Sequence, residues 1–368
     1  MTSPMLVFLH PHAGTGGAEE VLVAIVRGLA GDFPVVVVLL SHGALEERLR
    51  EAGAEVIVHR LPGRWTIPLY PFAARAIARK LEGRRVGLVH ANQTKAAVLG
   101  IPLARRVGVP LVWMKHGHDF NRAAPRFLGP RCDHLICVSE AVAATFPPRL
   151  RDRITVVYPG VEPPAEVSVI GEQPVVLSVG TLIPTKGHDT LIRAVALLRD
   201  REVDARLEVA GSEHRVAPGH RAQLERLIAE LGVGERVELL GWRDDMPVVY
   251  ARSRVVALGS RAAREGDPAE GAPLELLEAM AQGRPVVAPR EGGIAEILGG
   301  VGTTVREPTA VAYADALEPY LLDRERAAAA GAAGRARVED RFTIDRMVAD
   351  LEATYLSVIG DRSSAVSE

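Results

Sequence analysis

The sequence predicts an α/β protein built from two doubly wound, Rossmann-like domains. Short apolar runs of strand length alternate with amphipathic segments of helix length along most of the 368 residues. The runs are continuously apolar, which is typical of parallel strands covered by helices on both faces. The chain also exceeds the length that one hydrophobic core usually supports, so two domains are expected.

Two series of strands follow from these apolar runs. The first series comprises residues 5–10, 34–40, 55–61, 87–91, 111–116, 134–139 and 154–158. The second series comprises residues 174–180, 206–211, 237–241, 254–260 and 285–289. Residues 161–174 lie between them, are rich in Pro, Glu and Val, and lack a helical period. We therefore expect an N-terminal domain over 1–163, a linker over 164–173 and a C-terminal domain over 174–340.

Charge differs between the two halves of the chain. The whole chain has a formal net charge of −2, without the basic excess of a general nucleic-acid-binding protein. Residues 1–165 hold 20 Lys+Arg against 13 Asp+Glu, net +7, which leaves 24 against 33, net −9, for the remainder. The first half is therefore suited to an anionic partner.

Cysteine usage and the first residues predict a cytoplasmic location. Cys132 and Cys137 form neither a CxxC motif nor a zinc set, which favours a reducing compartment. The opening MTSPMLVFLH leads directly into a strand and lacks the regions of a signal peptide. No apolar run approaches the length of about 18 residues that a membrane span requires.

Two glutamates eight residues apart stand in EGAPLELLEAMAQGRPVVA, residues 270–288. The pattern predicts a loop with Glu270, a helix from about Pro273 to Gln282, and a buried strand. Helical spacing places Glu278 at the border of the apolar face and turns Glu275 away from it. Two solvated glutamates would have the same spacing.

The backbone before this helix offers a second feature. The amides of Gly271, Ala272 and Leu274 are expected to be unpaired, and they form a positive helix N-terminus. Such an end can bind an anion or the oxygens of a sugar.

A lysine opens the predicted helix of VGTLIPTKGHDTLIRAVALL, residues 179–198. The dipole of a helix disfavours a cation at this end unless an anion lies between them, so Lys186 beside Gly187 indicates an anion site. A first-turn lysine pointing to water is the alternative.

Glycines follow the first strand in HPHAGTGGAEEVLVAIVRGLA, residues 10–30. Gly16 and Gly17 allow a phosphate or sugar to approach the backbone closely. The loop is not the dinucleotide fingerprint, because Glu19 stands where the last glycine belongs.

Histidines end another predicted strand in VWMKHGHDF, residues 112–120. His116 can hydrogen-bond a sugar or assist catalysis, and His116 with His118 supplies two potential metal ligands. No third ligand at a recognisable spacing, no HExxH and no DxD motif accompanies them, so we expect no metal.

Basic and apolar residues alternate in RWTIPLYPFAARAIARKLEGRR, residues 64–85. A helix here carries Arg75, Arg79 and Lys80 together with the apolar residues Phe72, Ile77 and Leu81. That pattern suits the anionic inner face of a membrane or an anionic acceptor such as a polyprenyl-phosphate-linked lipid. A packed helix with a solvated basic face is the alternative.

Taken together, these motifs resemble the retaining glycosyltransferases of family 4, which have the GT-B fold of two Rossmann-like domains facing across a cleft. The E-x7-E block, the lysine loop, GGAE and KHGHDF carry the resemblance over nearly the whole chain. RFTIDRMVADLEATY, residues 341–355, is similar to the closing segment of that family. The resemblance therefore implies that residues 341–368 form a helix that crosses back to the N-terminal domain.

The resemblance also implies roles for individual residues. Glu278 would hold the ribose of a nucleoside-diphosphate sugar, Glu270 a hydroxyl of the transferred sugar, and Lys186 the diphosphate. His116 would touch the sugar near its reacting carbon. The remaining donor contacts would come from Gly16, Gly17, Gly271, Ala272, Pro273 and Leu274.

This chain departs from the family pattern at two positions. Thr181, in GTL, stands in the donor site where the family often has an arginine, and Pro159 stands where many members have asparagine. Arg261 or Arg264 is a candidate to supply the missing charge.

The activity implied is metal-independent transfer of a hexose to an acceptor hydroxyl with retention of configuration. UDP-glucose, UDP-N-acetylglucosamine and GDP-mannose fit the same loops, and a UDP-sugar is favoured as donor. The acceptor is expected to be a sugar, a lipid-linked molecule or another small molecule. A GT-B sugar-nucleotide epimerase and a non-catalytic nucleotide-sugar-binding protein are the alternatives, while the failed glycine fingerprint argues against a dinucleotide oxidoreductase.

Overall fold

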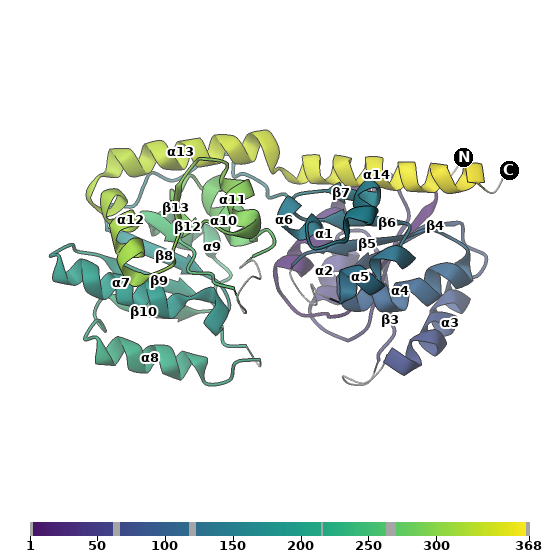
Figure 1. Ribbon diagram of the computed structural model, residues 1–368, viewed down its shortest axis with the longest axis horizontal. Helices are drawn as coiled ribbons and strands as arrows, with labels where there is room; N and C mark the ends of the chain where they lie inside the picture. Colours follow the sequence, from purple (N-terminus) through teal and green to yellow (C-terminus); the bar gives the residue numbers. More distant parts are fainter. Residues whose placement is uncertain (1–2, 62–66, 118–122, 215, 263–269, 366–368) are drawn as a thin grey trace. The chain divides into compact units, whose positions relative to one another are not determined.

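The computed structural model describes residues 3–61, 67–117, 123–214, 216–262 and 270–365 (Figure 1). The chain forms two compact units, which are Met1–Gly160 with Ile344–Glu368 (unit 1) and Val161–Thr343 (unit 2). Each unit contains one wholly parallel sheet with helices on its faces, which confirms the predicted fold class.

Unit 1 contains a seven-stranded sheet in the order β3-β2-β1-β4-β5-β6-β7. Its strands are β1 Met5–His10, β2 Val35–Leu39, β3 Glu55–Val58, β4 Val86–Asn92, β5 Leu111–Lys115, β6 His134–Cys137 and β7 Ile154–Val156. The central strands are buried along nearly their whole length, as their continuous apolar sequences predict.

Helices cover both faces of this sheet (Figure 1). They are α1 Gly17–Leu29, α2 Leu45–Glu51, α3 Tyr70–Lys80, α4 Thr94–Val107, α5 Ala124–Phe127, α6 Glu140–Ala143 and α14 Ile344–Ala365, with 3₁₀ turns η1 Ile67–Leu69, η2 Gly129–Arg131 and η3 Pro148–Arg153. Helix α1 packs against α2 and α14, while α3 packs against α4. Helices are expected on both faces of such a sheet, because the connections between its parallel strands are right-handed crossovers.

The C-terminal helix α14 is part of unit 1, as the closing segment predicts. The hydroxyl of Tyr355 lies 2.8 Å from Nδ1 of His90 on β4. A side chain on Gly28 of α1 would place its Cβ 2.5 Å from Val348, so only glycine permits this close packing of α1 and α14. The N-terminal strands therefore complete part of their helical cover with the end of the chain.

Unit 2 contains a six-stranded sheet in the order β10-β9-β8-β11-β12-β13. Its strands are β8 Val175–Val179, β9 Arg206–Ala210, β10 Val237–Gly241, β11 Val255–Ala257, β12 Val286–Pro289 and β13 Thr303–Val305. Its helices are α7 His188–Asp200, α8 His220–Glu230, α9 Met246–Arg252, α10 Leu274–Ala281, α11 Gly292–Leu298, α12 Ala310–Leu322 and α13 Arg324–Arg341, with the 3₁₀ turn η4 Pro184–Lys186. The sequence pattern missed β13, because three residues after a glycine-rich turn are too short to show a periodicity.

The strand order places one switch point in each unit. Successive strands are added outward in opposite directions from β1 and β4 in unit 1, and from β8 and β11 in unit 2. In doubly wound sheets, ligands bind beyond the carboxyl ends of the strands at such points. The loops after these four strands are therefore the places to examine for a site.

Candidate active site

Lys186 and Glu270 lie together at the switch point of unit 2. Lys186 follows β8 and Glu270 follows β11, and Nζ of Lys186 donates a hydrogen bond of 2.7 Å to Oε1 of Glu270. The same carboxylate oxygen accepts a hydrogen bond of 2.8 Å from Oγ of Ser260. Both partners of the ion pair are less than a quarter exposed.

A third charged residue, Glu275, completes this cluster. Its Oε1 lies 2.5 Å from Nζ of Lys186, and its side chain is 15% exposed. The sequence pattern turned Glu275 away from the apolar face of the helix and gave it no partner, whereas the structure brings it to Lys186. Glu275 lies on the partly exposed side of α10 with Leu274 and Glu278, whereas Leu276, Leu277, Ala279, Met280 and Ala281 are buried.

The electrostatic balance of the cluster favours a charged lysine. Burial alone would lower the pKa of Lys186, but the carboxylates of Glu275 and Glu270 outweigh it and raise the pKa above its ordinary value. One positive charge therefore faces two carboxylates in a partly buried site.

Close backbone contact holds the two loops against each other. Gly187 has a φ of +64°, and a Cβ there would lie 1.8 Å from the carbonyl oxygen of Gly259. The amide of Arg261 donates a hydrogen bond of 2.8 Å to the carbonyl oxygen of Thr185. Lys186 lies between these two contacts, so the backbone fixes its position.

Helix α10 carries the second glutamate of the E-x7-E pair. Oε2 of Glu278 accepts a hydrogen bond of 3.0 Å from the hydroxyl of Tyr250 on α9, a residue that the sequence pattern did not single out. Before the helix, the amides of Gly271, Ala272 and Leu274 have no hydrogen-bond acceptor in the described part of the chain. Pro273 is the N-cap residue of α10 and donates none. The helix thus presents unpaired amides beside Glu270.

Thr181 stands where the family often has an arginine, and Arg261 is a candidate to replace the charge of that arginine. Thr181 follows β8, and its carbonyl oxygen accepts hydrogen bonds from Ile183 N at 2.8 Å and His188 Nε2 at 3.4 Å. Arg261 pairs with Asp189 at the start of α7, with Nη2 3.0 Å from Oδ1. Its charge is therefore already partnered, and Arg264 lies outside the described residues.

A chain of four polar side chains occupies the switch point of unit 1. Nε2 of His10, at the end of β1, lies 3.0 Å from Oε1 of Glu19 in the first turn of α1. Nδ1 of His10 lies 3.0 Å from Nδ2 of Asn92, at the end of β4. Oδ1 of Asn92 in turn hydrogen-bonds Nε2 of His116, which follows β5. Of these four residues, the sequence pattern selected only His116.

The glycines of the first loop make room for this chain. Gly16 is the N-cap residue of α1, and its carbonyl oxygen accepts hydrogen bonds from the amides of Glu19 and Glu20. A Cβ on Gly16 would lie 2.7 Å from Oε2 of Glu19. Gly17 begins the helix. A larger residue at position 16 would therefore displace the carboxylate of Glu19.

Burial shifts the pKa values of two side chains in this hydrogen-bond chain. The pKa of His116 falls to about 3 because of burial and the neighbouring His10 and Lys115, against the opposing charge of Glu19. Burial alone would raise the pKa of Glu19, but the hydrogen bond from His10 holds it below its ordinary value. Glu19 is thus a carboxylate and His116 a neutral imidazole near neutral pH.

The predicted basic helix is α3, and the structure divides its apolar residues. Ile77 and Leu81 are buried in the core, whereas Phe72 is 73% exposed. Arg75, Arg79 and Lys80 are exposed beside it. The burial of Ile77 and Leu81 agrees with the alternative of a packed helix with a solvated basic face, and Phe72 is exposed on that basic face.

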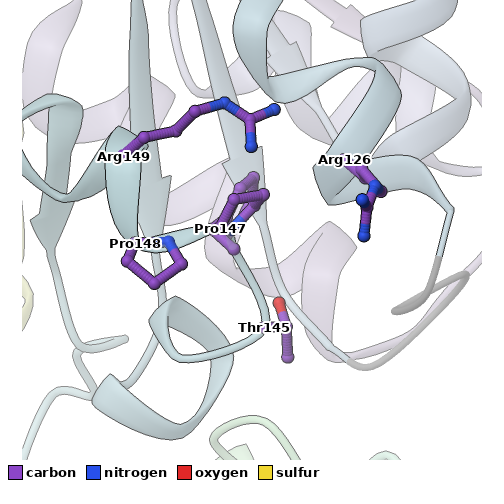
Figure 2. Close-up of a pocket in the computed structure, with 6 residues that line it drawn as sticks. Arg126, Thr145, Pro147, Pro148 and Arg149 are labelled. Carbon is purple, nitrogen blue, oxygen red and sulfur yellow. The ribbon is translucent and has the colours of Figure 1, made fainter.

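Unit 1 also contains a cavity of about 340 Å³. Figure 2 shows the side chains that line it. It is lined by Arg126, Thr145, Phe146, Pro147, Pro148 and Arg149. None of these residues was predicted to bind the donor. In the described ranges, no group of three or more His, Cys, Asp or Glu side chains is arranged to hold a metal ion. His118 lies outside those ranges.

Comparison with known proteins bears on both units. The family model for glycosyl transferases group 1 matches residues 164–337, and that for glycosyltransferase family 4 matches residues 15–164. The chain is 30% identical over 87% of its length to a GDP-mannose-dependent α-(1-6)-phosphatidylinositol monomannoside mannosyltransferase of Mycolicibacterium smegmatis, of which it covers 89%. It is 28% identical over 93% of its length to a D-inositol 3-phosphate glycosyltransferase of Salinispora tropica, of which it covers 78%.

A solved structure supports the same fold. Anabaena HepE in complex with UDP and glucose matches 96% of this chain and 100% of its own, with a TM-score of 0.82 and 22% sequence identity. Together with the two family models and the mannosyltransferase relative, this places the chain in glycosyltransferase family 4, whose members are retaining enzymes with the GT-B fold.

Proposed function

We propose that this glycosyltransferase moves mannose from GDP-mannose to a hydroxyl of an acceptor that carries an inositol phosphate group. The observation that carries the donor side of the proposal is the Lys186–Glu270 pair at the switch point of unit 2, beside the unpaired amides before α10. A buried ammonium group and preorganised amides are the groups that a departing diphosphate requires.

Each group of this cluster has a proposed role. Lys186 and the amides of Gly271, Ala272 and Leu274 neutralise the diphosphate as its charge grows. Glu270 accepts a hydrogen bond from a hydroxyl of the transferred sugar, and Glu278 accepts from the ribose. For Lys186 to reach a phosphate oxygen, it exchanges at least one carboxylate partner for that oxygen, because Glu270 and Glu275 both hold it in the structure.

Retention of configuration is proposed to proceed by a same-face displacement. The bond between the anomeric carbon and the phosphate oxygen breaks while the acceptor oxygen bonds to the same face of the sugar. The proton of the acceptor hydroxyl passes to the leaving phosphate oxygen, so the protein needs neither a glycosyl nucleophile nor a separate base. Lys186 contributes by stabilising the charge on the leaving group.

Two observations support an anionic acceptor. Residues 1–165 carry a net charge of +7. The two relatives described above are named for acceptors that contain inositol phosphate, namely a phosphatidylinositol mannoside and D-inositol 3-phosphate. The exposed basic face of α3 offers a surface for a lipid-borne acceptor or an anionic membrane.

The direct test is a transfer assay with two donors and two acceptors. GDP-mannose and UDP-glucose are each incubated with the purified protein and either inositol 3-phosphate or vesicles containing phosphatidylinositol, with and without EDTA. We expect nucleotide release that depends on the acceptor, uses GDP-mannose and persists in EDTA. Acceptor-independent conversion of the donor to an epimer would identify an epimerase, and donor binding without turnover would identify a sensor.

A further inference from the structure

The four-residue chain of unit 1 has a definite direction. The two oxygens of an ionised carboxylate only accept hydrogen bonds, so Glu19 requires His10 to carry its proton on Nε2. The amide nitrogen Nδ2 of Asn92 faces Nδ1 of His10, and because this NH₂ group only donates, Nδ1 accepts the hydrogen bond and carries no proton. The oxygen of the same amide only accepts, so it requires a proton on Nε2 of His116.

This direction determines which nitrogen of His116 is available. A neutral imidazole has one protonated nitrogen, and here that nitrogen is Nε2, bonded to Asn92. The other nitrogen, Nδ1, therefore carries a lone pair. With a single proton on His10, reversing the hydrogen bonds would require a donor at position 19, which an ionised glutamate cannot supply.

We propose that Glu19, His10 and Asn92 are positioning residues that hold His116 in one tautomer, with Nδ1 ready to accept a hydrogen bond from a substrate hydroxyl. The hydroxyl belongs to the sugar or the acceptor, a step that rests on the proposed function. This hydrogen-bond chain of four side chains requires no ligand. Its members come from β1, α1, β4 and the end of β5, so the fold of unit 1 alone assembles it.

Three of the four side chains in this hydrogen-bond chain are buried. His10 and Asn92 are fully buried, and Glu19 is 8% exposed. The charged and titratable groups facing His116 are His10 and Glu19 on the α1 side of the sheet, Lys115 on its own strand and His90 on β4. A buried network of this kind has one favoured arrangement, because an unpaired polar group inside it is costly.

The test reads the tautomer of His116 directly. Long-range ¹H–¹⁵N spectra are recorded near neutral pH on the full chain labelled at histidine, and the His116 signals are assigned with His116→Gln. We expect the wild-type protein to show a protonated Nε2 and an unprotonated Nδ1. In Glu19→Gln the side-chain amide can also donate, so both directions of the chain become available and His116 should show a population with a proton on Nδ1.

Two further variants complete the design. Asn92→Leu interrupts the chain and should also release the tautomer of His116, whereas His42→Gln removes an exposed histidine paired with Glu46 and should leave it unchanged. If Asn92→Leu does not fold, the His116 spectrum of Glu19→Gln alone tests the proposal. A wild-type His116 protonated on Nδ1, or a Glu19→Gln spectrum identical to that of the wild type, would overturn the proposal.

Kinetics then separate this proposal from the proposed function. With an active donor, Glu19→Gln should lower kcat by about tenfold with little change in the donor KM, and its pH profile should differ from that of the wild type. A single tautomer without transfer activity would support positioning and refute the function. Transfer activity together with an unchanged His116 tautomer in Glu19→Gln would support the proposed function and refute the positioning role.

Discussion

Nζ of Lys186 lies 2.7 Å from Oε1 of Glu270, although 84 residues separate them along the chain. Lys186 follows β8 and Glu270 follows β11, which are neighbouring strands at the switch point of the unit 2 sheet. Parallel strands bring their carboxyl ends to the same edge, so the two loops meet there. The pair is therefore a product of strand order, and it defines the centre of the candidate donor site.

Replacing Lys186 with Ala should lower kcat by about 10²–10³ while the protein stays folded, because the leaving diphosphate loses its cation. Arg236→Ala is a matched control, since Arg236 precedes β10 at the opposite edge of the same sheet and pairs with Asp204. Steady-state kinetics of both variants, with circular dichroism as the folding check, would test this role. Near-normal turnover in Lys186→Ala would remove Lys186 from the mechanism.

Replacing Glu275 with Gln should strengthen donor binding. The substitution removes one of two carboxylates that hold Lys186 and one negative charge that repels the diphosphate. At this partly buried position we expect a gain of about 1 kcal/mol, roughly fivefold in the donor KM. Glu225→Gln on α8, which removes an exposed carboxylate paired with Arg221, is the control. A higher donor KM in Glu275→Gln would mean that Glu275 positions Lys186 rather than competing for it.

Acid should destabilise the protein through its buried histidines. Burial lowers the pKa of His90 and His116 to about 3 and that of His188 to about 4, from an ordinary value of 6.5. The unfolded chain therefore binds more protons than the folded chain between about pH 6.5 and pH 4. The free energy of unfolding should fall as the pH falls through that range, by at most about 1.4 kcal/mol per pH unit for each histidine.

Chemical denaturation of the wild type at several pH values between 7.5 and 4.5 would measure this slope. His90→Gln should flatten it, because one of the three groups no longer takes up a proton on unfolding. His42→Gln provides the comparison with an exposed histidine. An unfolding free energy that does not depend on pH in this range would contradict the assignment of these histidines as buried and neutral.

Reversing the charges of α3 should weaken binding to anionic membranes. Arg75→Glu with Arg79→Glu alters two exposed cations beside Phe72, and each basic residue near such a surface contributes about 1 kcal/mol. Sedimentation with vesicles containing phosphatidylinositol should therefore show at least about a tenfold loss of binding. The control is Arg193→Glu with Arg226→Glu, which makes the same change in net charge at two exposed residues of unit 2. Equal losses in both double variants would indicate an effect of net charge rather than a surface on α3.

Helix α10 shows where the sequence was insufficient for the candidate site. Its spacing identified Glu270 and Glu278 as a pair but gave no role to Glu275, which the structure brings to Lys186. Helical periodicity describes one apolar face. It does not reveal that the loop after β8 brings Lys186 to the first turn of α10, because that contact depends on the order of strands distant in sequence.

The hydrogen-bond chain that ends at His116 was also beyond what the sequence could predict. His10 and Asn92 end strands that are distant in sequence, and Glu19 lies on the helix between them in the chain. Parallel strands bring their carboxyl ends to one edge of a sheet, but the sequence does not show which polar side chains there touch. Only the pairing of β1 with β4 decides that His10 lies beside Asn92.

The sequence by itself determined the fold class and the family. Continuous apolar runs such as residues 34–40 require cover on both faces, and local motifs such as the E-x7-E block are contiguous in the chain. Contacts between loops were decided only by the tertiary structure, among them Lys186 with Glu275 and the tight approach of Gly187 to Gly259. Such contacts depend on strand order and backbone packing, which a local periodicity does not encode.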